Sequence, residues 1–163
     1  MLALAAAQLG YRCHIYAPEE ESVAAEVSAQ CTRAVWGDRN ALGNFASQCD
    51  VITYEFENVP VGPLAILPQG KLRPGARALE TAQDRLVEKR FVEALGCRTA
   101  PFQPVDTASD LPGAIERIGT PGILKTVRDG YDGKGQWRIA SAHEAEGLVL
   151  PHAALIYEGF VHF

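Results

Sequence analysis

A glycine-rich loop carries the first chemical signal in the sequence. The segment GYDGKGQW, residues 130–137, holds Gly130, Gly133 and Gly135 together with Lys134. Because glycine has no side chain, backbone N–H groups of such a loop can surround phosphate oxygens, and the lysine adds positive charge. Glycine and aspartate are also common in ordinary turns, so the loop alone leaves both interpretations open.

Two charged residues lie in apolar sequence on either side of this loop. Lys125 belongs to GILKTV and Glu158 belongs to IYEGFV. An ammonium group among apolar residues is costly to bury without an anion, so Lys125 is predicted to bind nucleotide phosphates. A carboxylate at a strand end can accept hydrogen bonds from a ribose or an exocyclic amine. The alternatives are a lysine that extends to solvent from an edge strand and a carboxylate that is merely solvated.

A pair of acids marks a second candidate site. Glu55 and Glu57 stand two positions apart in VITYEFENVP, where Asn58 and Pro60 follow. In a strand this spacing puts both carboxylates on one face, near the strand end that faces ligands in doubly wound sheets. Since two like charges so placed are destabilising without a bound donor, we expect the pair to bind one.

Composition limits the class of protein. The chain has 163 residues, 47% hydrophobic and 21% charged, and no apolar run approaches the roughly 20 residues that span a bilayer, which predicts a globular protein without a membrane segment. A net charge of −5 argues against general nucleic-acid binding. The four cysteines and four histidines lack metal-ligand spacing, so we expect a reducing cytoplasm and no metal held by this chain.

The first half of the chain alternates helical and strand patterns. The apolar segment from Leu2 to Leu9 predicts a buried helix that ends at Gly10, and Asp38 is a candidate N-cap for a later helix. This alternation predicts a doubly wound parallel sheet whose first strand and glycine turn are missing, which favours truncation. The further elements are expected as strands at 11–16, 33–37 and 50–56 and helices at 18–30 and 39–49.

The second half predicts a long helix followed by another α/β domain. Residues 78–96 have helical periodicity and end at Gly96, and Pro101 and Pro104 indicate an extended linker. A capped helix with Pro112 in its first turn comes next. The remaining elements are expected as strands at 122–127 and 136–140 around the glycine loop, a helix at 142–150 and a strand from 154 that is unfinished at 163.

Three segments resemble one family. AQDRLVEKRFVEALG, ILKTVRDGYDGKGQW and VITYEFENVP closely resemble the 5-(carboxyamino)imidazole ribonucleotide synthases, ATP-grasp enzymes of purine biosynthesis. The resemblance implies an α/β fold with an N-terminal doubly wound parallel-sheet (pre-ATP-grasp) domain and part of the ATP-grasp domain. It gives boundaries at 1–77 for the first domain, 78–100 for a connecting long helix, and 101–163 for a small ATP-grasp subdomain without its catalytic part.

The resemblance also implies an activity. Members of the family are ADP-forming carbon–nitrogen ligases that use ATP, magnesium and bicarbonate to carboxylate 5-aminoimidazole ribonucleotide to N5-carboxyaminoimidazole ribonucleotide on the way to IMP. They are cytoplasmic homodimers. Arg85 is implied in ATP binding, with an ion pair to Glu88 as its compatible alternative role. The resemblance implies ATP contacts from Arg85, Lys125, Gly130, Tyr131, Asp132, Gly133, Lys134, Gly135, Gln136, Glu158, Gly159, Phe160 and Val161. It implies substrate contacts from Glu55, Glu57 and Tyr131, with the two glutamates assigned to the amine or ribose of the imidazole nucleotide.

The chain departs from the family pattern in three ways. It lacks the glycine-rich first turn that holds the substrate phosphate, and it lacks the strands that carry magnesium ligands, so the catalytic residues are unknown and this chain alone is expected to be inactive. Asp129 replaces a usual glycine and could stiffen the loop. Two alternatives stay open: another ATP-grasp ligase, such as a formate-dependent glycinamide ribonucleotide transformylase, and a non-catalytic nucleotide-binding fragment.

Overall fold

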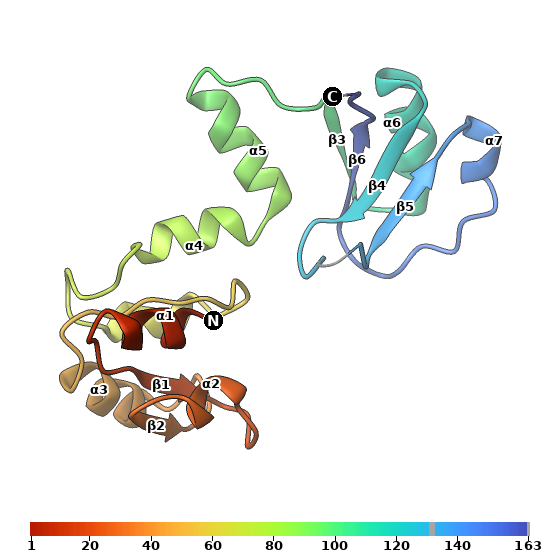
Figure 1. Cartoon of the computed structure of the whole chain (residues 1–163). Helices are drawn as coiled ribbons and strands as arrows, with labels where there is room; N and C mark the ends of the chain where they lie inside the picture. The colour runs from red at the N-terminus through yellow and green to blue at the C-terminus, as the bar shows by residue number, and fades with distance from the viewer. Residues whose placement is uncertain (131–132, 163) are drawn as a thin grey trace. The chain divides into compact units, whose positions relative to one another are not determined.

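The computed structural model describes residues 1–130 and 133–162 and divides the chain into two compact units, Met1–Glu80 and Thr81–Phe163 (Figure 1). Each unit has a hydrophobic core of its own. Within the described ranges, no helix has the length and apolar character needed to cross a membrane.

The N-terminal unit opens with alternating helices and strands. Strands β1 and β2 pair in parallel, with His14 opposite Gln30, and the short helix α2 lies between them in sequence. This is the crossover connection that parallel strands require. The bounds are α1 Leu2–Gln8, β1 His14–Ala17, α2 Val23–Glu26, β2 Gln30–Arg33, α3 Arg39–Ser47, the 3-10 helix η1 Gly62–Ile66 and α4 Ala76–Ala82, whose last residues fall in the second unit.

Helix α3 anchors the core of this unit at both of its ends. The Asp38 carboxylate accepts two backbone N–H bonds at 2.9 and 3.1 Å, which confirms the predicted N-cap. The Lys71 ammonium donates to Ala46 O at 2.9 Å and Cys49 O at 2.5 Å at the other end of the helix. These bonds satisfy groups that a helix leaves unpaired, so α3 can bury its apolar side. The core consists of Leu42, Phe45, Ala46, Ile52, Val59, Leu64, Leu72 and Leu79.

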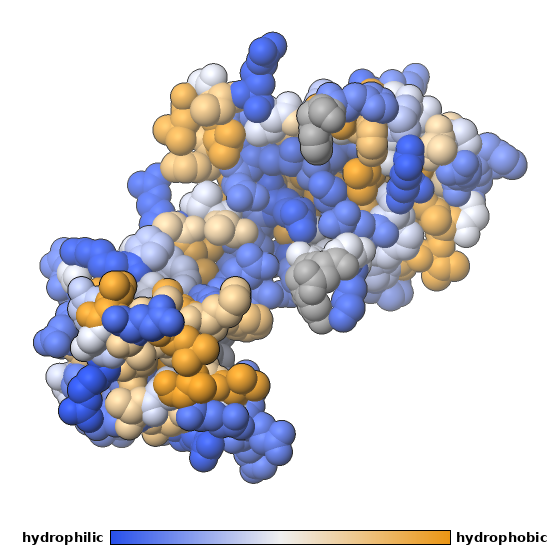
Figure 2. Space-filling model, viewed as in Figure 1, coloured by the Kyte–Doolittle hydropathy of each residue, from blue (hydrophilic) through white to orange (hydrophobic). Residues whose placement is uncertain are grey.

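Two expectations for α1 have different outcomes. The helix ends as predicted, because Gly10 takes a φ of +85° beyond the C-cap. The expectation that it is buried is wrong, since Ala3 is its one buried residue and Leu2 and Leu4 are 46% and 53% exposed. Figure 2 shows hydrophobic surface over this region of the unit. Helix α1 stays exposed because the core of this unit is built from α3 and the segments after it, and includes no residue of α1.

The expected strands of the N-terminal unit are shorter or shifted. The strand predicted at 33–37 lies at Gln30–Arg33, and the helix predicted at 18–30 forms only at Val23–Glu26. The strand predicted at 50–56 is wrong, because in that segment only Ile52 bridges a neighbour, Leu72. A strand persists only where a partner satisfies its backbone groups, and beyond this bridge the described chain bends and turns.

The predicted long helix is also wrong, because it is broken. Helix α4 ends at Ala82 and a separate helix, α5 Arg85–Ala94, follows. Between them Asp84 is extended, with φ of −128° and ψ of 112°, and its carboxylate accepts from Leu86 N and Val87 N, both at 3.1 Å. Aspartate at an N-cap starts a new helix by satisfying its first N–H groups, so the periodic pattern spans two helices.

The C-terminal unit contains a four-stranded antiparallel sheet in the order β3-β6-β4-β5 (Figure 1). The linker expected around Pro101 and Pro104 is wrong in part, because Pro104 lies within β3. A proline is tolerated there because β3 is an edge strand and one side of its backbone needs no partner. The bounds are β3 Phe102–Val105, η2 Ala108–Asp110, α6 Leu111–Ile118, β4 Gly122–Thr126, β5 Gln136–Ile139, α7 Ala142–Ala145 and β6 Leu155–Gly159.

The two faces of this sheet differ in chemistry. Leu124 and Tyr157 are cross-strand partners, and both are buried at 0% exposure on the face that packs against α6. The next residues along each strand, Lys125 and Glu158, point to the opposite face because successive side chains alternate. The predicted strands on both sides of the glycine loop, and Pro112 in the first turn of α6, are confirmed.

Tyr157 fixes the end of this sheet. Its phenol donates to Gly119 O at 2.8 Å, and burial raises the pKa of the hydroxyl above its usual value of 10.0. The ring also occupies the place where a side chain at Gly122 would stand, because a Cβ built there meets the phenol oxygen and ring carbons. Glycine is therefore required at position 122 by packing.

We predict that Gly122→Ala lowers the free energy of unfolding by about 2–3 kcal/mol, because the new methyl group collides with the Tyr157 ring. Urea unfolding measures the change. The matched control is Gly113→Ala in α6, where a Cβ meets nothing within 4 Å and alanine is the better helix former. Equal stability of the two variants would contradict this account of the packing.

Candidate functional site

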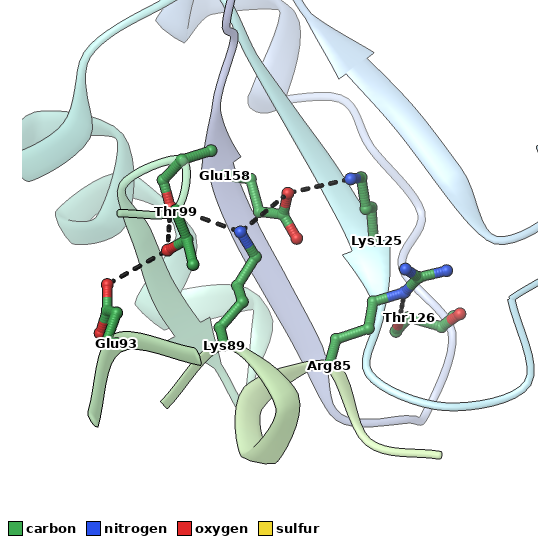
Figure 3. A network of polar contacts seen from close by, with 8 residues as sticks. Arg85, Lys89, Glu93, Thr99, Lys125, Thr126 and Glu158 are labelled. Carbon is green, nitrogen blue, oxygen red and sulfur yellow. Dashed lines mark hydrogen bonds and ion pairs between the residues drawn. The ribbon is translucent and has the colours of Figure 1, made fainter. Parts of the chain in front are cut away.

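A buried carboxylate lies on the face of the second sheet that is turned away from α6. Glu158 on β6 is 7% exposed, and its Oε2 atom lies 2.9 Å from the Lys125 Nζ and 3.4 Å from the Lys89 Nζ. Figure 3 shows the two lysines reaching the carboxylate from different elements, β4 and α5. One carboxylate oxygen therefore holds two ammonium groups together.

The register of the sheet explains the first of these contacts. Lys125 pairs with Ile156, and Glu158 pairs with Ile123. The two charged residues are thus diagonal neighbours on one face of antiparallel strands, a separation that long side chains can bridge. The predicted anionic partner of Lys125 is provided, in this structure, by a carboxylate of the protein.

The second contact comes from a residue that the sequence analysis did not single out. Lys89 on α5 has a side chain that is 15% exposed, and its ammonium also donates to Ala100 O at 3.4 Å. The same ammonium lies 5.3 Å from the centre of the Phe102 ring, a cation–π distance. The signal that could have found it is its spacing of four from Arg85, which puts both side chains on one face of a helix.

The charges of this cluster do not cancel. Glu158 carries one negative charge, and Lys89 and Lys125 carry two positive charges, so the three groups have a net charge of +1. Charges with so little exposure are costly to desolvate unless they are paired. The surplus positive charge favours an additional anion on this face of the sheet.

Arg85 holds the start of the glycine loop. Its Nε donates to Thr126 O at 3.2 Å and its Nη2 donates to Gly130 O at 3.1 Å, while its backbone N–H donates to Val127 O at 3.0 Å. These carbonyl groups, and not Glu88, are the partners that the described residues give Arg85. An ion pair between Arg128 and Asp84, 3.3 Å, adds a second link. The first turn of α5 is therefore bound to the loop.

The glycines of the loop are required by its own geometry. Gly133 and Gly135 have φ values of +77° and +67°, and a Cβ at Gly135 would stand 2.7 Å from the Thr126 hydroxyl oxygen. Asp129 also has a positive φ, 60°, which non-glycine residues adopt at a cost. The predicted ligand contacts at Tyr131 and Asp132 lie outside the described residues. Of the remaining predicted loop contacts, Lys134 and Gln136 are exposed.

The segment after Glu158 is tied to two prolines. Gly159 N donates to Pro101 O at 2.9 Å and Phe160 N donates to Pro121 O at 3.1 Å. The Phe160 ring lies 5.1 Å from the Arg138 guanidinium carbon, and Val161 is 47% exposed. These bonds give residues 158–160 a defined backbone course next to the charged cluster.

Glu55 and Glu57 belong to the N-terminal unit and are exposed there. The argument that both acids share one strand face is wrong, because Glu55 lies in a bend and Glu57 in a turn. Among the residues that the structure describes, no group of three or more His, Cys, Asp or Glu side chains is placed to hold a metal ion.

The comparisons with known proteins define the class of protein. Residues 1–83 match the family of the ribonucleotide synthetase preATP-grasp domain, and residues 90–163 match the ATP-grasp domain. The chain belongs to this family of preATP-grasp domains, joined here to an ATP-grasp domain. The predicted fold class is thereby confirmed.

Individual relatives show which ATP-grasp proteins this chain is similar to. The N5-carboxyaminoimidazole ribonucleotide synthases of Brucella melitensis and Bacillus subtilis are 44% and 36% identical over 100% of this chain. The crystal structures of the synthetases from Thermus thermophilus (TM-score 0.81, 43% identity, 100% of this chain) and from Staphylococcus aureus with ADP (TM-score 0.85, 32% identity, 99% of this chain) have the same fold. The chain covers 46% and 44% of the two relatives and 44% of each crystallised chain. The predicted resemblance is confirmed, and the chain spans less than half of these proteins.

We predict that Arg85→Ala speeds amide hydrogen exchange of Thr126 and Val127 about tenfold, because both charge-assisted bonds to the start of the loop are lost. These two amides donate to Gly135 O and Ala154 O, so their exchange reports opening of the loop base. Arg90→Ala, an exposed arginine on the same helix, is the control. Unchanged exchange in Arg85→Ala would show that the strands alone hold the loop.

Proposed function

We propose that the intact protein to which this chain belongs is an ATP- and bicarbonate-dependent ligase. It carboxylates the amine of 5-aminoimidazole ribonucleotide to N5-carboxyaminoimidazole ribonucleotide in purine biosynthesis and releases ADP. The observation that carries the proposal is the ion pair at 2.9 Å between the buried Glu158 and the partly buried Lys125, with a glycine loop after one strand and the 158–161 segment at the end of the next. The names of the relatives support the same reaction.

The surplus positive charge explains how the site would receive a nucleotide. Lys125 provides the ammonium for phosphate oxygens, and the loop backbone from Gly130 to Gln136 provides N–H groups around them. The structure of the Staphylococcus aureus relative contains ADP, which supports this assignment. Arg85 holds the start of the loop against α5. In this proposal the rest of its guanidinium binds the phosphates.

Residues 158–161 would bind the ribose and the base of the nucleotide. The Glu158 carboxylate is suited to a ribose hydroxyl or an exocyclic amine. Gly159 N and Phe160 N already have carbonyl partners, so the base edge is left to the backbone of Val161. Glu55, Glu57 and Tyr131 serve the imidazole ribonucleotide in this proposal, and the two glutamates act from exposed positions rather than from a strand face.

Magnesium, bicarbonate and a second subunit complete the proposal. Magnesium would neutralise charge on the transferred phosphate. The described residues do not form a carboxylate cluster that fits the ion, so we assign no step of the reaction to a metal bound by them. The protein would act in the cytoplasm as a homodimer, as the family resemblance implies.

We predict that Lys125→Ala in the intact protein weakens ATP binding by about 2–4 kcal/mol, because an ammonium group that binds phosphate is lost. The melting temperature changes little, since Lys89 still pairs with Glu158. Isothermal titration calorimetry and thermal unfolding measure the two effects. The control is Arg98→Ala, an exposed arginine in the same unit. Unchanged ATP affinity would make Lys125 a purely structural partner of Glu158.

We predict that the intact protein releases phosphate from ATP and bicarbonate much faster with 5-aminoimidazole ribonucleotide than without it. Coupling requires the amine to consume the activated carboxyl group, so turnover depends on the ribonucleotide. A phosphate-release assay with and without the ribonucleotide measures this dependence. Equal rates would refute the coupling. Turnover of glycinamide ribonucleotide with formate would instead identify the transformylase reaction.

A further inference from the structure

The Glu158 carboxylate has more cations than it needs for neutrality. Lys125 and Lys89 bind the same oxygen at 2.9 and 3.4 Å, and they come from β4 and α5 (Figure 3). One ammonium group would be enough to balance one carboxylate. The second ammonium therefore has a role other than balancing the charge of Glu158 in the nucleotide-free protein.

Nucleotide binding changes what Lys125 must do. If its ammonium turns to phosphate oxygens, the contact of 2.9 Å to Glu158 weakens or breaks. Removing the partner of a buried charge leaves the other charge uncompensated, which is strongly unfavourable. A Glu158 side chain that is 9% exposed has little water available to replace the lost cation. The bound state then depends on a cation that stays in place.

We infer that Lys89 is a positioning residue that holds the Glu158 carboxylate charged and in place for the nucleoside while Lys125 binds phosphate. The inference rests on the proposed function, since it assumes that a nucleotide occupies this site. It gives the two lysines different tasks, with Lys125 exchanging partners and Lys89 keeping its partner.

The surroundings of Lys89 suit a cation that does not move. Its ammonium donates to Ala100 O at 3.4 Å and lies 5.3 Å from the Phe102 ring centre, so contacts other than Glu158 hold it. Phe102 is the cross-strand partner of Glu158 on β3, which brings the ring, the ammonium and the carboxylate together. In contrast, the Lys125 ammonium donates to Glu158 itself, and the described residues provide no second side-chain partner for it. The lysine with fewer fixed contacts is the one that can turn to the phosphates.

ADP binding to the intact protein, measured by isothermal titration calorimetry, tests the inference. Lys89→Met keeps the apolar stem and removes the charge, and we expect it to weaken ADP binding about tenfold. Lys89→Arg should restore most of the affinity, because a guanidinium can still pair with the carboxylate. The matched control, Arg90→Met, removes one positive charge from the exposed side of the same helix and should leave the affinity unchanged.

A double-mutant cycle with Glu158→Gln shows whether Lys89 acts through the carboxylate. In the Glu158→Gln background, Lys89→Met should cause no further loss of ADP affinity, because no charge remains to be held. A full tenfold loss in that background would overturn the inference and place Lys89 directly on the nucleotide. Unchanged affinity in Lys89→Met with a lowered melting temperature would also overturn it, and would make the contact a structural link between α5 and β6.

Two further measurements keep the test decisive. If Lys89→Met does not fold, Lys89→Gln replaces it in the same cycle, with the same outcomes supporting or overturning the inference. Wild-type protein that binds no ADP at all would refute the proposed nucleotide site itself. Wild-type protein that binds ADP, with the Lys89 variants binding equally well, would refute only the role of Lys89.

Discussion

The burial of one carboxylate is the constraint on which the C-terminal unit depends. Glu158 is 7% exposed, and a charge so placed is tolerated only with cations close by. Lys125 meets this need from the neighbouring strand and Lys89 meets it from a helix that is distant in sequence. The contact between α5 and β6 and the contact between β4 and β6 both meet this requirement.

Side chains of this sheet alternate between its two faces, so that core residues and charged residues lie on opposite faces. Leu124 and Tyr157 point into the core, while the residues that follow them, Lys125 and Glu158, point to the other face. A shift of the register by one residue would exchange the two sets and bury charges among apolar side chains. The core therefore fixes the register, and the register brings the charged pair together.

Much of the C-terminal unit was predictable because its signals are local. The glycine loop between two strands, the capped helix with Pro112 and the strand that carries Glu158 each have a pattern within a few residues. The N-terminal unit was less predictable, because the segment 50–56 has strand composition but only Ile52 has a neighbour to bridge. Composition shows that a segment can adopt an extended backbone. A strand forms only where a neighbouring strand also pairs with its backbone N–H and C=O groups.

The sequence by itself determined the family, the fold class, and the presence of Lys125 and Glu158 beside a flexible loop. Tertiary structure decided which charges meet. Lys89 stands on a helix that looked continuous with α4 in the sequence, and it reaches Glu158 because Asp84 starts a new helix there. Pairing across 69 residues of chain leaves no periodic signal, since it depends on where the helix packs and not on the residues beside it.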